Sequence, residues 1–145
     1  MTTSDRDAID ALYARWRKAV EAADIPGYVS VLHPDVRLMP PGAPDIVSAA
    51  SYGAFLGPVF QDASYRIEVL AMPEIEVLGD AAVARYEYAI HLSLKDPSRQ
   101  ISEPGALTAS RTASRYFDVL RRIDDGGTGG SWRVWRHTWN ASALE

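Results

Sequence analysis

The sequence contains no cysteine, so the chain can form no disulfide and offers neither a thiolate metal ligand nor a cysteine nucleophile. Its three histidines show no HxH or HxxxH spacing, so we expect no metal site. Basic residues are few: 15 against 19 acidic residues give a net charge of -4, which argues against a surface for nucleic acid or anionic membrane. No apolar run is long enough to span a membrane, and the N-terminus lacks a signal-peptide pattern, so we expect a cytoplasmic protein.

The composition that is present is typical of an ordinary globular protein. The chain has 145 residues, of which 47% are hydrophobic and 23% are charged. A chain of this length can bury one substantial core, but it is too short for two. We therefore expect a single domain over residues 1–145.

The N-terminal part carries the periodicity of helices. Ser4, followed three residues later by Asp7, resembles a capping box, and apolar residues then recur at helical spacing. This pattern predicts an amphipathic helix over residues 5–22. Asp24 can cap a second, shorter helix, with Pro26 in its first turn, where a missing N–H costs nothing.

A short strand and a third helix follow. His33-Pro34 should end the second helix, and residues 35–39 alternate like a strand. Residues 52–60 place their apolar side chains on one helical face. Gly57-Pro58 should end or bend that helix in its last turn.

Beyond residue 63 the hydrophobic period changes from 3.6 to 2, which is the period of strands. We expect four strands, at residues 65–78, 82–94, 111–123 and 132–140. Pro73 requires a bulge or an edge position in the first of them. The glycine-rich residues 124–130 should make the turn of a hairpin between the last two. Helices followed by strands predict an α+β fold, with three N-terminal helices on one face of a mostly antiparallel sheet.

Several stretches of the chain resemble a known family. They are LYARWRKAVEAADIPGYVSVLHPDVRLMPPG, GDAAVARYEY, SRYFDVLRRIDDG and SWRVWRHTWN, in this order. The resemblance is to the SnoaL-like proteins of the nuclear transport factor 2-like superfamily, and it covers about residues 6–141. It implies a cone in which three helices close a strongly bent sheet, with a pocket inside and commonly a homodimer. Isomerases, dehydratases, hydrolases, cyclases and non-catalytic binders share this fold, so it implies no single activity.

The ketosteroid isomerases of this superfamily use a carboxylate base and an oxyanion hole made of a tyrosine and a protonated carboxylic acid. The family's helical tyrosine falls on Trp16 of this sequence, and its base falls on Met39 or Pro40. Only the acid has a counterpart, which is Asp118 in Phe-Asp-Val-Leu-Arg-Arg. The resemblance therefore carries over one of the three groups.

Asp118 is the first candidate for a catalytic residue. It shares a strand face with Tyr116 and Leu120, and this is the face that we expect to point into the cone. An inward carboxylate must be paired, protonated or close to water, because burying it unpaired costs several kcal/mol. The alternative is that Asp118 faces solvent or is satisfied by backbone donors.

His137 is the second candidate. Strict alternation places it on one strand face with Trp135 and Trp139, and counting from the hairpin turn puts Trp135 opposite Asp118. His137 would then be a diagonal neighbour of Asp118, within reach for an acid–base pair. The alternative is a histidine in the core or at the rim that bonds to one carbonyl.

Aromatic side chains could line a cavity suited to a flat, apolar ligand. The candidate ligand-binding residues are Trp16, Met39, Phe55, Tyr88, Tyr116, Trp135 and Trp139, with Tyr13 as a further aromatic residue. The alternative is that most of them fill a solid core. Our hypothesis is a small apolar or aromatic partner and acid–base chemistry without a cofactor; the alternative is a non-catalytic binding or dimerisation module.

The outer face of the long strands is the expected surface of a homodimer. Strict alternation points Val83, Ala89, Trp132 and Val134 outward. An open, curved sheet with exposed apolar residues needs cover, and a second copy of the chain can provide it across a two-fold axis.

Overall fold

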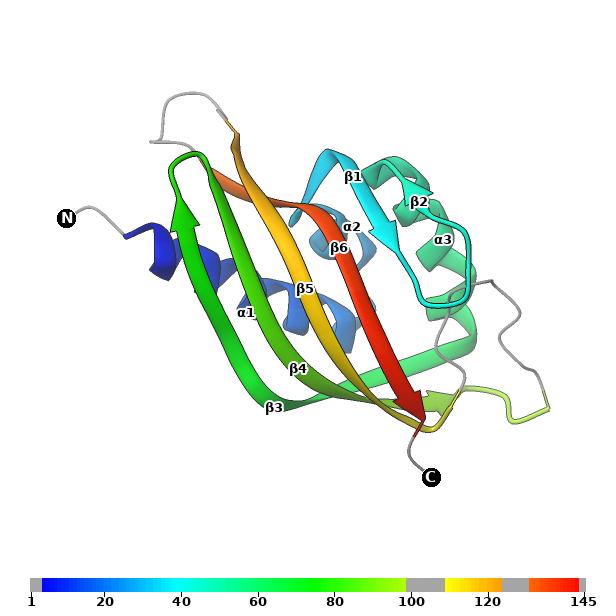
Figure 1. Ribbon diagram of the computed structural model, residues 1–145. Coiled ribbons are helices and arrows are strands. Elements are labelled where there is room, and N and C mark those ends of the chain that lie inside the picture. Colours follow the sequence, from blue (N-terminus) through cyan, green and yellow to red (C-terminus); the bar gives the residue numbers. More distant parts are fainter. Residues whose placement is uncertain (1–3, 99–108, 124–130, 144–145) are drawn as a thin grey trace.

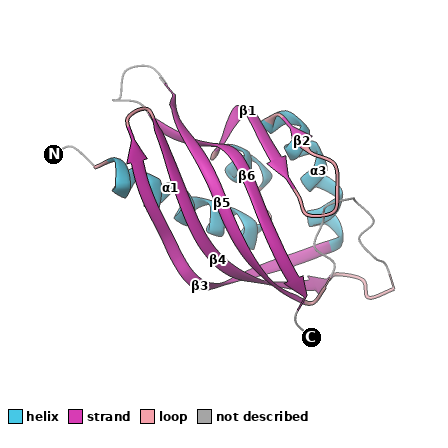
Figure 2. Ribbon diagram, viewed as in Figure 1, coloured by secondary structure: helices cyan, strands magenta, loops and turns pink. Residues whose placement is uncertain are grey.

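Three helices lie behind one face of a six-stranded sheet in the computed structural model, which describes residues 4–98, 109–123 and 131–143 (Figure 1, Figure 2). The elements are α1 (Asp5–Ala22), α2 (Ile25–Val29), β1 (Leu32–Met39), β2 (Ile46–Val47), α3 (Ala49–Asp62), β3 (Ala63–Leu78), β4 (Ala81–Leu94), β5 (Arg111–Ile123) and β6 (Ser131–Ala143). The helices precede the four long strands, as the change of period predicts.

Helix α1 has the bounds that its cap and periodicity predict. The Ser4 side chain accepts a hydrogen bond from the backbone N–H of Asp7 at 3.1 Å and so caps the first turn. One face of α1 packs into the core through Ile9, Leu12, Tyr13, Trp16, Ala19 and Val20. Within the described residues, no helix is long and apolar enough to cross a membrane.

Helix α3 continues past the proline that was expected to end or bend it. It runs to Asp62 with Pro58 inside. Pro58 removes one backbone N–H from the helix, but Val59 and Phe60 are both buried in the core. Their burial holds the last turn in place.

Strand β1 begins earlier than its alternation indicates, so His33-Pro34 lies inside a strand instead of ending α2. The neighbouring strand β6 explains the difference, because β1 runs parallel to it and Leu32 pairs with Val134. The β1–β6 register then shifts between Leu32 and Arg37, which is where the proline lies. A tertiary contact thus recruits residues whose local pattern is not that of a strand.

The strands form one sheet in the order β2-β1-β6-β5-β4-β3, in which only β1 and β6 are parallel. The long strands curve around the helices, and the sheet does not close (Figure 1). The predicted α+β fold, with three helices on a strongly bent and mostly antiparallel sheet, is confirmed. The inner face of this sheet carries the core.

Strand β3 places Pro73 on the sheet edge, next to shifts in its register with β4. A bulge or an edge position was expected at this proline, and the structure has both a register shift and an edge strand. Strands β5 and β6 pair in antiparallel fashion. The glycine-rich turn expected between them, residues 124–130, lies outside the described residues.

Strand β6 contains a bulge at Trp135. Val119 of β5 pairs with Arg136, but the next residue, Leu120, pairs with Val134, so Trp135 has no partner in β5. One extra residue on one strand interrupts the alternation of side chains. Residues on the two sides of the bulge are therefore out of phase with a strict period of two.

The bulge corrects the predicted faces of β6. Trp132 and Val134 are 2% and 4% exposed and belong to the core, as opposed to the outer face predicted for them. Trp135, expected inside the cone with His137, lies instead against the guanidinium group of Arg136, whose Cζ is 3.5 Å from the ring centroid. Alternation was the wrong rule here because it allows for no inserted residue.

The outer face of the sheet carries part of the apolar surface that was predicted for it. Ala89 lies between the inward-facing Tyr88 and Ile90, and it is outside the core cluster but covered by its neighbours. Phe117 of β5 is 48% exposed. Of the four residues predicted on this face, Val83 and Ala89 thus lie on it, whereas Trp132 and Val134 belong to the core.

We expect the two tryptophans beside the bulge to differ in their effect on stability. Trp132→Ala should lower the free energy of unfolding by about 3–5 kcal/mol, because it empties a core position. Trp135→Ala, the matched control, should cost below about 1 kcal/mol, because its ring is outside the core. Urea unfolding of both variants measures this, and equal losses would contradict the assigned faces.

Candidate functional site

A buried carboxylate with three side-chain partners lies at the centre of the candidate site. Asp118 is 0% exposed. Its Oδ2 accepts hydrogen bonds from the hydroxyl groups of Tyr13 and Tyr86, both at 2.7 Å. Its Oδ1 lies 2.6 Å from Nδ1 of His137. The group therefore has the partners that a buried carboxylate needs.

Four elements bring these side chains together. Tyr13 comes from the buried face of α1. Tyr86 lies on the inner face of β4, two residues after Ala84, which is the register partner of Asp118. His137 of β6 is directly opposite Asp118 of β5. The bulge in β6 produces this direct pairing, whereas counting from the hairpin turn had predicted a diagonal one.

The two tyrosines act as proton donors to Asp118. Burial raises the pKa of both Tyr13 and Tyr86 well above the usual range of tyrosine, and the neighbouring charge of Asp118 raises it further. Both hydroxyls therefore keep their protons at neutral pH. Two donors on Oδ2 leave Oδ1 to hold the imidazole of His137.

His137 lies between this carboxylate and a cavity. Its side chain is 8% exposed and forms part of the cavity wall. A neutral imidazole that donates its Nδ1–H to Asp118 carries its lone pair on Nε2, on the far side of the ring from that bond. This arrangement can accept a proton from a molecule in the cavity, with Asp118 stabilising the imidazolium that results.

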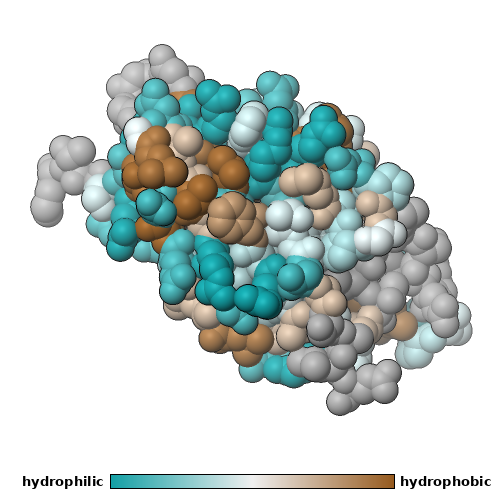
Figure 3. All heavy atoms as spheres, in the orientation of Figure 1, coloured by the Kyte–Doolittle hydropathy of each residue, from teal (hydrophilic) through white to brown (hydrophobic). Residues whose placement is uncertain are grey.

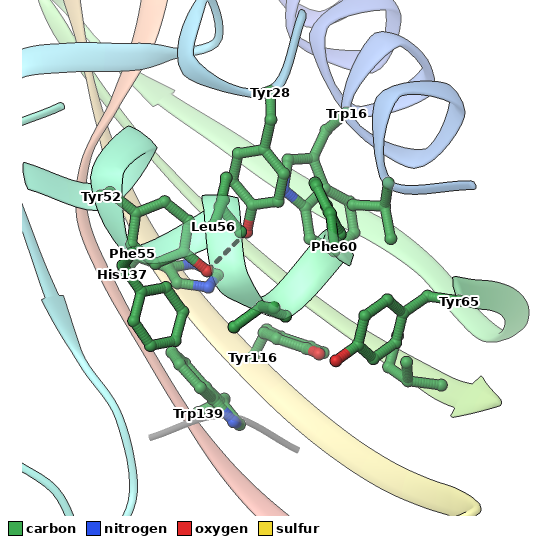
Figure 4. A pocket seen from close by; sticks show the side chains of 13 residues that line it. Trp16, Tyr28, Tyr52, Phe55, Leu56, Phe60, Tyr65, Tyr116, His137 and Trp139 are labelled. Atoms are coloured by element: carbon green, nitrogen blue, oxygen red, sulfur yellow. Dashed lines mark hydrogen bonds between the residues drawn. The ribbon is translucent and has the colours of Figure 1, made fainter. Parts of the chain in front are cut away.

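The cavity lies between the helices and the inner face of the sheet and has a volume of about 80 Å³ (Figure 4). Its wall is formed by Trp16, Val20, Tyr28, Tyr52, Phe55, Leu56, Val59, Phe60, Tyr65, Ile90, Tyr116, His137 and Trp139. One buried water needs about 10–15 Å³ on this measure, so the space admits a larger molecule. None of these side chains carries a permanent charge.

The family model described as a SnoaL-like domain matches residues 1–138. The chain belongs to the SnoaL-like family. No curated protein matches it. The family assignment therefore rests on nearly the whole length of the chain, and the chemistry has to be argued from its own residues.

Solved structures similar to this SnoaL-like protein share its fold. A conserved protein from Planctomyces limnophilus has a TM-score of 0.75 at 19% identity, over 95% of this chain and 98% of that one. A ketosteroid isomerase-like protein from Erwinia carotovora atroseptica has 0.72 at 21%, over 99% and 100%. A nuclear transport factor 2-like superfamily protein from Salmonella enterica has 0.72 at 19%, over 94% and 89%. The cone fold is thus established for the SnoaL-like chain.

The cavity of the SnoaL-like protein contains most of the predicted ligand-binding residues. Trp16, Phe55, Tyr116 and Trp139 line it together with His137. The Tyr116 ring stacks on His137, with centroids 5.5 Å apart and an interplanar angle of 26°. These contacts place the imidazole in an aromatic wall.

Three predicted residues lie elsewhere. Tyr88 is fully buried in the core, where its hydroxyl accepts a hydrogen bond from Arg17 at 2.8 Å, and it is outside the cavity wall. Trp135, the inserted residue of the bulge, lies on the outer face against Arg136. Met39 is the register partner of Thr138, the neighbour of the inward-facing His137, so alternation places it on the outer face as well.

Four tyrosines of the site were not predicted as such. Tyr13 was predicted only as a further aromatic residue that could line a cavity, and no role was predicted for Tyr86. No role was predicted for Tyr28 or Tyr52 either, yet their hydroxyl oxygens lie 3.1 Å apart in the cavity wall. Their inward helical positions were the available signal, but no local pattern shows which hydroxyls meet.

Among residues 4–98, 109–123 and 131–143, no group of three or more His, Asp or Glu side chains is arranged to hold a metal ion. The described chemistry of the site thus consists of hydrogen-bond donors, one carboxylate and one imidazole.

We expect Tyr13→Phe to lower the free energy of unfolding by about 1.5–3 kcal/mol, because a charged buried acceptor loses a donor. In an Asp118→Asn background the same change should cost only about 0.5–1.5 kcal/mol, the value of a neutral hydrogen bond. Urea unfolding of the four proteins of this cycle measures the difference. Equal costs in both backgrounds would show that Tyr13 does not act on a charged group.

Proposed function

We propose that this SnoaL-like protein binds a small, neutral, largely apolar or aromatic molecule and transfers a proton on it through His137, without a cofactor. The observation that carries the proposal is the position of His137. Its Nδ1 is held by the buried Asp118 at 2.6 Å, while the same ring forms part of the cavity wall. A base oriented by a carboxylate and facing an apolar space is suited to general acid–base catalysis.

The cavity wall supports the choice of a neutral, aromatic molecule. Its described lining consists of aromatic and aliphatic side chains with a few hydroxyl and ring N–H groups. An ion placed there would lose its hydration with no opposite charge in the wall to replace it. A flat apolar ring, in contrast, would find stacking partners such as Trp139 and Tyr116, which are themselves 5.9 Å apart between centroids.

Asp118 is the positioning residue in this proposal. It is not part of the wall of this cavity, so a bound molecule would meet His137 first. Tyr13 and Tyr86 fix the carboxylate from the opposite side and keep it from rotating. The pair of Asp118 and His137 is thereby held in its working geometry before a ligand binds.

We expect the wild-type protein to accelerate the elimination of 5-nitrobenzisoxazole, a small neutral aromatic probe of general bases. The base removes the C3 proton, the N–O bond breaks, and the electron pair ends on the phenolate oxygen of the product. His137→Ala should lower kcat/KM at least about 100-fold. Asp118→Asn should lower it too, because the imidazole loses the charged acceptor that orients it and that stabilises the imidazolium.

His91→Ala is the matched control for that assay. His91 pairs with Glu68 at 2.9 Å and points to the outer face of β4, away from the cavity, so its loss should leave the rate unchanged. Binding of the probe with no acceleration would refute the catalytic part and leave a non-catalytic ligand-binding protein. Equal rates for wild type and His137→Ala would refute the role of His137.

We also propose a homodimer that pairs the outer faces of two sheets. One register row crosses this face from Glu76 of β3 through Val83 and Val119 to Arg136 of β6. The centre of this row is apolar and lies beside the exposed Phe117, and its two ends carry opposite charges. Figure 3 shows an apolar area on this face, bordered by hydrophilic side chains. A two-fold axis through the centre would bring each acidic end against a basic end of the partner.

Sedimentation equilibrium should give twice the chain mass of 15.9 kDa at micromolar concentration. Phe117→Glu should shift the protein to the monomer, because it places a charge at the apolar centre of the interface. Met72→Glu, at an exposed apolar residue of the edge strand β3, serves as the control and should remain dimeric. A wild-type mass near that of one chain would contradict the dimer.

A further inference from the structure

A recess on the outer face of the sheet lies apart from the cone and from the Asp118 site. It crosses the strands close to the β3–β4 turn and has a volume of about 300 Å³. This volume is at the lower end of the range for small-molecule sites. The recess is lined by Leu78 of β3, Asp80 of the turn, Ala81 of β4, Val119 and Arg121 of β5, and Trp135 of β6.

The floor of the recess is made of small side chains, with larger ones at its two ends. Ala81 is the register partner of Arg121, and Val119 lies two residues earlier on the same face of β5. Leu78, 55% exposed, stands at the β3 end, and Trp135 stands at the β6 end. Neighbouring strands are about 4.8 Å apart, so the three steps from β3 to β6 span about 14 Å. A molecule with a fused pair of rings fits this length.

The bulge in β6 supplies the indole at one end of the recess. Trp135 has no partner in β5, and its side chain is half-buried on the outer face. The guanidinium of Arg136 packs on this ring, and its Nη1 donates hydrogen bonds to the carbonyl oxygens of Trp135 at 2.9 Å and of Asp35 at 3.2 Å. These contacts hold Arg136, and with it the indole, in a fixed position.

Arg121 brings a positive charge without a counterion to the same end. It is exposed, and its Cζ lies 5.1 Å from the centroid of the Trp135 ring. Within residues 4–98, 109–123 and 131–143, no carboxylate lies within ion-pair distance of Arg121. The carboxylate in the recess, that of Asp80, lies 3.7 Å from Nε of Arg122. This end of the recess is therefore positive, although the whole chain has a net charge of -4.

We propose that this recess is a second binding site, and that its ligands are small organic anions in which a carboxylate is attached to a flat apolar body. The carboxylate pairs with the guanidinium of Arg121. The apolar body lies over Ala81 and Val119 and against the indole of Trp135. The site is independent of the function proposed for the cone, whose cavity wall carries no charged partner for such a ligand.

The lining accounts for this class of ligand. A cation would meet the charge of Arg121, while the carboxylate of Asp80 already has Arg122 as its partner. An inorganic anion would gain only one exposed ion pair, which is worth about 0–1 kcal/mol. It would also leave the floor and the indole uncovered. An aromatic carboxylate uses the charge and the apolar surface together.

The anion and the proposed dimer use different charges of the outer face. The dimer row ends at Arg136, whereas the anion pairs with Arg121, which lies in the next row toward the β3–β4 turn. The strands curve around the helices, so the outer face is convex (Figure 1). Two convex faces that meet at the centre of the dimer row diverge away from it, which leaves the end of the recess at Arg121 and Trp135 open.

The test titrates ¹⁵N-labelled protein with 2-naphthoate and follows the indole N–H signals of the four tryptophans by NMR. Trp135→Leu identifies the signal of Trp135. This signal should shift and saturate with a Kd of about 1 mM or below. The signal of Trp139, which lines the cone, should stay in place. Naphthalene-2-carboxamide, the neutral analogue, should bind about 3- to 5-fold more weakly because it lacks the charge.

Arg121→Gln should weaken the binding of 2-naphthoate about 3- to 5-fold, because it removes the cation. Arg115→Gln is the matched control, since Arg115 is exposed on the same face of the same strand but lies outside the recess, and it should leave the Kd unchanged. Equal losses in both variants would show unspecific attraction to a basic strand and overturn the inference. A shift of the Trp139 signal in place of that of Trp135, or no shift up to about 10 mM, would overturn it as well.

Discussion

The hydrogen bonds of Asp118 are the constraint on which the rest of this structure depends. A carboxylate with no exposed surface is tolerated only when donors surround it, and here those donors come from α1, β4 and β6. The same contacts therefore fix the first helix on the sheet and orient the imidazole of His137. Fold and candidate chemistry share one group, so a change at Asp118 affects both.

A single inserted residue decides which side chains of β6 reach that group. The bulge at Trp135 shifts the alternation, turns Trp132 and Val134 into the core, and places His137 directly opposite Asp118. Without the bulge, the register of residues 131–134 would continue, Arg136 would pair with Asp118, and His137 would lie opposite Phe117 on the outer face. Bulges often re-aim side chains near functional sites, and this one also moves an indole ring to the outer face, against Arg136.

Only part of the ketosteroid isomerase pattern is present in this chain. Tyr13, one helical turn before Trp16, is the tyrosine whose hydroxyl reaches Asp118. The positions expected for the base hold Met39 and Pro40, which cannot accept a proton. In our proposal His137 supplies that function from β6. The shared cone fold thus leaves open which strand provides the base, in keeping with the many chemistries found on one fold.

The sequence alone determined the helix over residues 5–22 and the long strands in their order along the chain, because periodicity and capping are local properties, and it made Asp118 a candidate for the inner face. Of the seven residues predicted to bind a ligand, Trp16, Phe55, Tyr116 and Trp139 lie in the cavity wall, together with the predicted His137. Only the tertiary structure decided the face of Trp135, the outward position of Met39, the meeting of Tyr28 with Tyr52, and the extension of β1 through Pro34. These depend on a bulge, on a parallel neighbour and on contacts between distant elements, and no local pattern records them.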